Sequence, residues 1–373
     1  MRKAPNGQHI IQLFEQYSPK KMAMEGDKIG LQIGTLNKTI HRVMIALDVL
    51  EEVVDEAIEK KVDLIIAHHP PIFRPLKQIV TDSPQGKIVE KCIKHNISIY
   101  AAHTNLDVAK GGVNDLLAEK LKLTNTKVLV PTYTEELKKL VVFVPESHEE
   151  CVREAIGQAG AGFIGNYSHC TFNTSGVGTF LPLEGTNPYI GEKGKLEHVN
   201  EVRIETIFPA SIQSKVIKAM IKAHPYEEVA YDIYPLENEG ETYGLGRIGE
   251  LNESLSLEQF AKYVKDSLQV EGVRVVGDLS TTVKKVAVLG GDGNKFIHQA
   301  KMSGADVYVT GDIYYHVAHD AMMMGLNIVD PGHHMEKVMK EGVAKKLSEL
   351  CEEEGISVEI FPSEPSTDPF KFI

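Results

Sequence analysis

The sequence predicts an α/β protein: two similar α/β halves form one discontinuous domain, and a ferredoxin-like α+β domain is inserted between them. Two observations support this prediction. In the first and last thirds of the chain, continuous apolar runs alternate with helical stretches of about 10–15 residues, as in a parallel sheet covered by helices. In the middle third the order becomes strand-helix-strand-strand and then strand-helix-strand, which suits a ferredoxin-like fold.

The first half is expected to cover residues 1–126. Buried apolar runs predict strands, and apolar residues at helical spacing predict helices. The expected strands are 41–49, 62–69 and 97–107, the last of which runs into a polar loop, and the expected helices are 50–61, 84–96 and 111–123. The polar residues that follow these strands should meet at one rim of the sheet, where sites form in such folds.

The second half is expected to cover residues 241–373. Its predicted strands are 284–293, 305–312, 326–334 and a closing strand at 356–362, and its predicted helices are 294–304, 314–325 and 335–355. No close sequence repeat links the two halves. A formal GxGxxG pattern at 244–249 alternates like a strand and opens no helix, so we reject a dinucleotide-binding fingerprint. The segment GGDG at 290–293 is interpreted as a tight turn, with an anion site as the alternative.

The inserted domain is expected at 127–240. Its predicted strands are 138–145, 201–209 and 228–236, its predicted helices are 147–160 and 211–224, and an antiparallel pair is expected within 167–183. The segment HPYEEVAYDIY at 224–234 carries a histidine and two glutamates. We interpret it as a packing and turn element, because it lies far in the sequence from the other candidate residues.

Histidines and carboxylates gather at the predicted strand ends. His68 and His69 end one strand, Asp107 follows another, and DPGHHMEK at 330–337 ends a third and opens a helix. In that segment His333 and Glu336 are three residues apart, which places them on one helical face. Either histidine of the pair, His333 or His334, could face a metal.

Three imidazoles and two carboxylates exceed the needs of one tetrahedral ion and suffice for two ions bridged by a carboxylate. This ligand chemistry suits zinc first, with iron, manganese, nickel or cobalt as alternatives, better than calcium or magnesium. A single histidine at a strand end would more simply be a hydrogen-bonding residue, but three such segments together favour metal binding. Asp312 and His316 are candidates for a supporting or substrate-contact role.

The amino-acid composition limits the kinds of partner that we expect the protein to bind. Lys and Arg total 40 against 52 Asp and Glu, a formal charge of -12, which argues against general nucleic-acid binding. No apolar run approaches the roughly 20 residues that cross a bilayer, so we expect a cytoplasmic protein with no membrane partner. The four cysteines show no CxxC spacing, and no disulfide framework is expected.

Five motifs, in this order, resemble one family over nearly the whole chain: GDKIGLQIG (26–34), AHHPPIF (67–73), HTNLD (103–107), TGDIYYH (310–316) and DPGHHMEK (330–337). The sequence is similar to the GTP cyclohydrolase 1 type 2 homologues, also called NIF-three-like proteins. HPYEEVAYDIY resembles the motif of the inserted domain in the long bacterial members.

The resemblance implies a dinuclear metal centre between the two halves, a CutA-like inserted domain and assembly into a hexamer. It assigns one ion to His69, Asp107 and Glu336, and the other to His68, His333 and Glu336, with Glu336 bridging. We therefore predict a metal-dependent hydrolase that acts on a nucleotide or phosphate-bearing small molecule through a metal-bridged water. The alternative is a non-enzymatic metal-binding scaffold, metal-delivery or regulatory protein.

Overall fold

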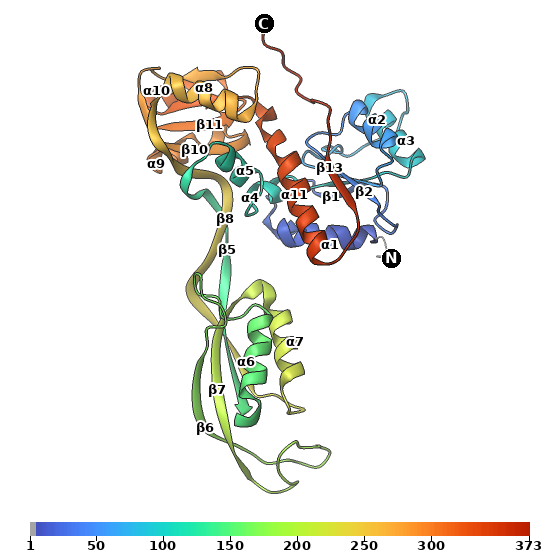
Figure 1. Cartoon of the computed structure of the whole chain (residues 1–373), viewed down its shortest axis with the longest axis vertical. Helices are drawn as coiled ribbons and strands as arrows, with labels where there is room; N and C mark the ends of the chain where they lie inside the picture. Colours follow the sequence, from blue (N-terminus) through green and yellow to red (C-terminus); the bar gives the residue numbers. More distant parts are fainter. Residues whose placement is uncertain (1–4) are drawn as a thin grey trace. The chain divides into compact units, whose positions relative to one another are not determined.

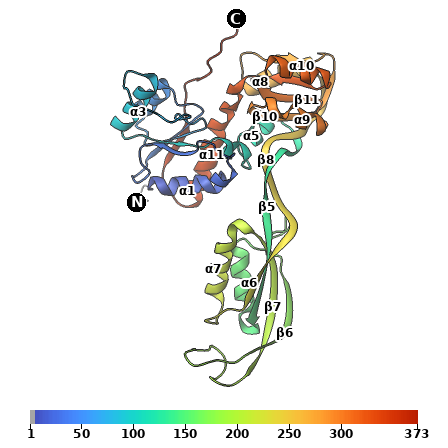
Figure 2. The ribbon, with the colours of Figure 1, turned by 180° about the vertical axis from the view of Figure 1, so that it is seen from behind.

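The computed structural model describes residues 5–373 of the chain, which divides into two compact units (Figures 1 and 2). The first unit joins the segment that ends at Tyr133 to the segment that begins at Tyr243, and the second unit is Thr134–Thr242. Helices and two mixed sheets make up the fold, which confirms the predicted α/β class. No helix of the described residues is long and apolar enough to cross a membrane.

The first sheet of the first unit has five strands in the order β1-β4-β3-β2-β13. They are β1 (Gly30–Ile33), β2 (Arg42–Ala46), β3 (Leu64–Ala67), β4 (Ser98–Ala101) and β13 (Glu359–Pro362). The central strands β3 and β4 are buried along their whole length, which explains their continuous apolar runs. Strands β2, β3 and β4 are parallel, so their carboxyl ends share one rim.

One strand belongs to a different sheet from the one expected. β13 pairs in parallel with β2, so the prediction that the run at 356–362 closes the last third is wrong. The long helix α11 (Val338–Glu353) packs against β2, β13, α1 and α5 and returns the chain to the first sheet. The apolar run shows that a strand forms, but its partner depends on where the preceding helix packs.

The second sheet contributes β8 (Tyr231–Ser256), β10 (Thr282–Asp292), β11 (Val307–Gly311), β12 (Asn327–Asp330) and β9 (Arg274–Val276) to the first unit, side by side in this order. Strands β10, β11 and β12 are parallel, and β8 and β9 flank them in antiparallel orientation. The GxGxxG pattern lies within β8, so no helix follows it and no dinucleotide turn forms, as expected from its alternation.

Helices cover both sheets. In addition to α11 they are α1 (Gly7–Tyr17), α2 (Glu51–Glu59), α3 (Pro84–Lys94), α4 (Thr104–Val108), α5 (Val113–Lys120), α8 (Leu257–Leu268), α9 (Ile297–Met302) and α10 (Tyr315–Met323), with 3-10 turns η1 (Lys20–Met22), η4 (Asn294–Phe296) and η5 (His333–Lys337). The segment HTNLD, expected as a loop, mostly forms α4. A partly buried ion pair joins α5 to β8, where the Arg247 guanidinium donates to both Asp115 carboxylate oxygens.

The second unit has the element order β-α-β-β-α-β that is expected of a ferredoxin-like fold. Its elements are β5 (Thr124–Pro145), η2 (Glu146–His148), α6 (Glu149–Gln158), β6 (Phe172–Phe180), β7 (Glu197–Pro209), η3 (Ala210–Ile212), α7 (Gln213–Ala223) and the first part of β8, in the sheet order β6-β7-β5-β8. The antiparallel pair predicted within 167–183 is wrong, because β6 runs unbroken along β7 from Phe172 to Phe180.

Candidate metal centre

The five predicted ligands lie together in the first unit, although up to 268 positions separate them in the sequence. His68 and His69 directly follow β3, and Asp107 lies in α4, just beyond β4. His333 and Glu336 lie in η5, shortly after β12. Each therefore lies beyond the carboxyl end of a parallel strand, where open α/β sheets place their sites.

The carboxylate of Glu336 is the centre of the cluster. Its Oε2 lies 3.1 Å from His69 Nε2, 3.3 Å from His333 Nε2 and 3.7 Å from His68 Nε2. Glu336 is only 3% exposed. A carboxylate oxygen that faces three imidazole nitrogens is well placed to bind two metal ions at once.

Two buried atoms in the cluster have no hydrogen-bond partner among the described residues. They are His68 Nε2 and Asp107 Oδ1, which face each other at 3.6 Å. Buried polar atoms in proteins are nearly always paired, and both a neutral imidazole nitrogen and a carboxylate oxygen are metal ligands. The residues present therefore fit a divalent transition metal.

Each of the three imidazoles is oriented through its other nitrogen. His68 Nδ1 lies 2.9 Å from the Ala102 carbonyl oxygen, His69 Nδ1 2.7 Å from Asp48 Oδ1, and His333 Nδ1 2.7 Å from Asp312 Oδ2. A ring that donates from Nδ1 keeps the Nε2 lone pair for a ligand bond. Asp312 thus contacts a candidate ligand directly. Asp48 was not among the predicted site residues, although it also lies just beyond the end of a strand, β2.

Without metal, the cluster binds protons strongly. Burial disfavours the charged form of His69, but hydrogen bonds from its ring to Asp48 and Glu336 raise its pKa to about 10. The hydrogen bond to Glu336 raises the pKa of His333 to about 9. Burial raises the pKa of Asp107 to about 6. The cluster therefore attracts positive charge, which a metal ion supplies more compactly than protons.

The structure divides the candidate ligands into three groups, in each of which the ligand atoms lie within 4.8 Å of one another: His68 with Asp107 and Glu336, His69 with His333 and Glu336, and His68 with His69 and His103. The resemblance paired the histidines the other way, His69 with Asp107 and His68 with His333. Adjacent residues in extended backbone point in opposite directions, so only the tertiary structure decides which one faces α4 and which one faces η5.

His103 is a neighbour that the sequence analysis did not assign as a ligand. Its Nδ1 lies 2.9 Å from Asp27 Oδ1, and Asp27 also accepts the backbone N–H of Thr104. The motif HTNLD contained this histidine, and GDKIGLQIG contained its acceptor. By contrast, the half-buried His334 lies outside all three groups, and His316 in α10 packs against Tyr315 instead.

The glycines of GGDG pack against Glu336. A Cβ at Gly290 would approach Glu336 Oε1 to 3.0 Å, and one at Gly291 to 2.9 Å. Gly291 also has a φ of 66°, which side chains rarely adopt. This close approach of the backbone to a carboxylate supports the turn interpretation of GGDG over the anion-site interpretation.

A mixed α/β fold with histidines and carboxylates clustered at its strand ends defines a class of protein that could hold metal ions there. Residues 5–369 match Duf34/NIF3 (NGG1p interacting factor 3), and the chain belongs to this family, as its motifs predicted. A Bacillus subtilis relative, named GTP cyclohydrolase 1 type 2 homolog, is 66% identical over 373 residues and covers 100% of both chains.

Solved structures agree with this assignment. The crystal structure of a Bacillus cereus protein related to NIF3 is 67% identical, has a TM-score of 0.95 and covers 100% of both chains. A Staphylococcus aureus protein of solved structure is 32% identical, has a TM-score of 0.77 and covers 99% of both chains.

Proposed function

We propose that the protein is a dinuclear metal-dependent hydrolase that acts on a nucleotide or another phosphate-bearing small molecule. One observation carries the proposal: a single buried oxygen, Glu336 Oε2, lies among the Nε2 atoms of His68, His69 and His333. The GTP cyclohydrolase 1 type 2 homolog name of the Bacillus subtilis relative supports a nucleotide substrate.

The grouping of side chains suggests which residue would hold which ion. His68 and Asp107 would hold one, His69 and His333 the other, and Glu336 both. Zinc is the first choice for such ligands, with iron, manganese, nickel and cobalt as alternatives. Ions bound in this way supply Lewis-acid chemistry for hydrolysis.

The chain's own residues orient the ligands and leave one side open. The side chains of His69 and His333 are 24% and 38% exposed, whereas that of His68 is fully buried. A small molecule could therefore approach from the His333 side, while the His68 side excludes water. A hexamer, which the resemblance implies, belongs to the same proposal and is tested by the mass of the purified protein in solution.

Metal content and turnover test the proposal separately. Protein purified without chelator should contain about two transition-metal ions per chain by elemental analysis. His68→Ala and Glu336→Gln should reduce this content to one or none. Glu341→Gln in α11, where the side chain is 76% exposed, is a matched control that should keep both ions. A wild type without transition metal contradicts the metal centre.

Turnover distinguishes the enzyme from a scaffold, metal-delivery or regulatory protein. The metal-loaded wild type should hydrolyse at least one member of a panel of nucleotides and phosphate esters, with release of product measured by chromatography. Glu336→Gln should abolish this activity, and Glu341→Gln should retain it. Two bound ions with no turnover across the panel would favour the non-enzymatic role.

A further inference from the structure

The second unit contains a cavity of about 670 Å³ that is separate from the metal cluster. It lies on the face of the sheet opposite to α6 and α7. Val202 and Ile204 of β7 are buried in the core with residues of these helices, whereas Glu201 and Arg203, which alternate with them, line the cavity. A cavity of this size is typical of small-molecule sites.

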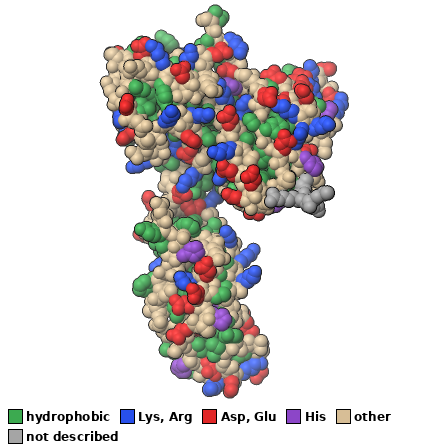
Figure 3. Space-filling model, viewed as in Figure 1, with side chains coloured by type: hydrophobic (Ala, Val, Ile, Leu, Met, Phe, Trp, Pro, Cys, Tyr) green, Lys and Arg blue, Asp and Glu red, His purple; other side chains and the backbone are tan. Residues whose placement is uncertain are grey.

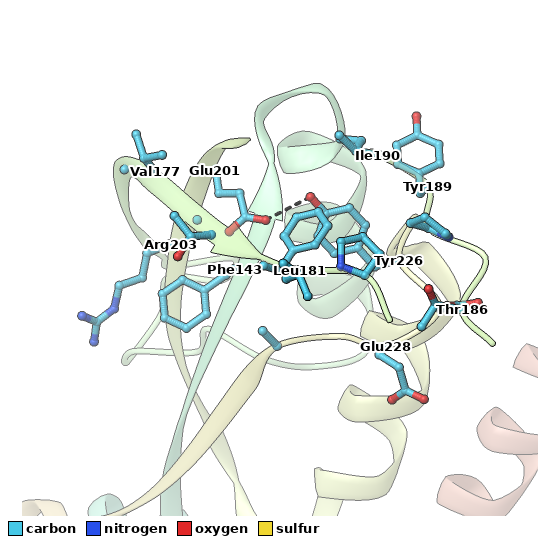
Figure 4. A pocket seen from close by; sticks show the side chains of 18 of the residues that line it. Phe143, Val177, Leu181, Thr186, Tyr189, Ile190, Glu201, Arg203, Tyr226 and Glu228 are labelled. Carbon is cyan, nitrogen blue, oxygen red and sulfur yellow. Dashed lines mark hydrogen bonds between the residues drawn. The ribbon is translucent and has the colours of Figure 1, made fainter. Parts of the chain in front are cut away.

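Most of the wall is aromatic and aliphatic. Phe143 of β5 forms part of it, and Leu181, Tyr189 and Ile190 come from the segment between β6 and β7, as Figure 4 shows. Tyr226 belongs to HPYEEVAYDIY, the segment to which the sequence analysis gave only a packing role. Its ring lies 6.3 Å from that of Tyr189 and 5.8 Å from that of Phe180. These rings suit a flat apolar ligand.

One carboxylate inside the cavity has no cation beside it. Glu201 is 9% exposed, and its Oε1 accepts a hydrogen bond of 3.0 Å from the Tyr226 hydroxyl (Figure 4). Within residues 5–373 we find no ion pair to Glu201. The neighbouring Arg203 pairs instead with Glu205, at 2.9 Å. Because a buried carboxylate is costly without a partner charge, the cavity favours a cation.

Together, the other charged residues that line the cavity also favour a cation. Glu227 and Glu228 also line the cavity, so three carboxylates oppose the single guanidinium of Arg203. Glu227 accepts the backbone N–H of Asn187 and thereby ties the segment between β6 and β7 to the cavity wall. This balance disfavours anions such as phosphates.

We propose that this cavity is a binding site for a small molecule that combines a flat aromatic ring with a positively charged amine. The ring packs among Phe143, Tyr189 and Tyr226, and the ammonium group contacts the Glu201 carboxylate. The site does not depend on the metal centre and uses no residue of it.

Three indoles that differ in charge test the proposal: tryptamine, neutral indole and indole-3-acetate. Because the chain contains no Trp, the fluorescence anisotropy of each indole can be followed without overlapping Trp emission from the protein. Full-length protein should bind tryptamine at least about tenfold more tightly than indole, and indole-3-acetate most weakly, because the contact with Glu201 is charge-assisted. Equal affinities for all three, or no binding, would overturn the proposal.

Matched variants locate the site. Glu201→Gln should remove the preference for tryptamine over indole. Glu154→Gln, which changes an exposed carboxylate of α6 on the other face of the sheet, should keep it. Ala230→Leu fills the cavity without changing Glu201 and should weaken the binding of all three indoles. This second variant keeps the proposal testable if Glu201→Gln does not fold. A preference for tryptamine that survives Glu201→Gln, or affinities that Ala230→Leu leaves unchanged, would refute the assignment. If tryptamine is released as the protein self-associates, a second copy of the chain covers this face. That result would also refute the proposed small-molecule site.

Discussion

At the scale of single residues, the candidate metal centre depends on acceptors that fix each imidazole. Asp48 and Asp312 accept hydrogen bonds from His69 and His333, respectively. A backbone carbonyl oxygen accepts a hydrogen bond from His68. Asp312 has a φ of 57°, an uncommon conformation for a residue other than glycine. Such strain is typical of functional positions.

Asp48→Asn should weaken metal binding without removing a ligand. The variant replaces the charged acceptor of His69 Nδ1, and loss of such a partner typically lowers metal affinity about 10- to 100-fold. Competition with a chromophoric chelator measures the change. Asp55→Asn in α2, where the carboxylate pairs with Lys91, is the control and should bind metal as the wild type does. An unchanged affinity of Asp48→Asn would show that the charge of Asp48 does not support metal binding through His69.

At the scale of elements, the link between α7 and β8 is held by one histidine. His224 is buried, its Nδ1 accepts the backbone N–H of Tyr226, and its Nε2 lies 3.0 Å from the Phe143 carbonyl oxygen. This arrangement fixes the neutral tautomer with the proton on Nε2. A second proton on Nδ1 would face a donor, so the element requires an uncharged ring.

Acid should therefore destabilise the second unit through His224. Burial lowers the pKa of His224 below its usual 6.5, so below about pH 6.5 the unfolded chain binds a proton that the native ring resists. The contribution to stability is complete above that pH and is lost as the pH falls through the native pKa. Urea unfolding between pH 7 and pH 5 measures it.

His224→Asn keeps an acceptor but does not titrate in this range. The variant should be less stable at pH 7, and its stability should vary less with pH than that of the wild type. His198→Asn changes an exposed histidine of β7 and should leave the wild-type slope unchanged. If His224→Asn and the wild type have equal slopes, the tautomer argument is wrong.

At the scale of the whole molecule, the two units differ in their charged sites. All five candidate ligands belong to the first unit, and the aromatic cavity belongs to the second. On the face drawn in Figure 3, acidic side chains are interspersed with Lys and Arg. Neither the metal cluster nor the cavity provides the basic surface that nucleic acid requires.

Removal of metal should destabilise the first unit selectively. An ion at 100 times its dissociation constant contributes about 2.7 kcal/mol per site to the state that binds it. A chelator should therefore speed amide exchange in β2 and β3 and leave α6 and α7 unchanged, as measured by hydrogen-exchange mass spectrometry. Glu336→Gln should show no chelator effect. Equal changes in both units would contradict a site confined to the first.

Local sequence patterns predict much of the fold and of the candidate site. The apolar runs at 62–69 and 305–312 contain the strands β3 and β11, whose residues are all buried. Histidines at strand ends indicated the candidate cluster, because parallel strands bring their carboxyl ends to one rim. Five motifs indicated the family, which the match over residues 5–369 confirms.

Other features of the fold and of the sites depend on long-range packing. The sequence alone determined that a strand lies within 356–362 and that His68 and His69 lie at the end of a strand. Only the tertiary structure decided that β13 joins β2, that His68 faces Asp107 while His69 faces His333, and that Glu201 lies in an aromatic cavity. Periodicity records which side of an element is buried, whereas the partner on that side depends on how distant elements pack.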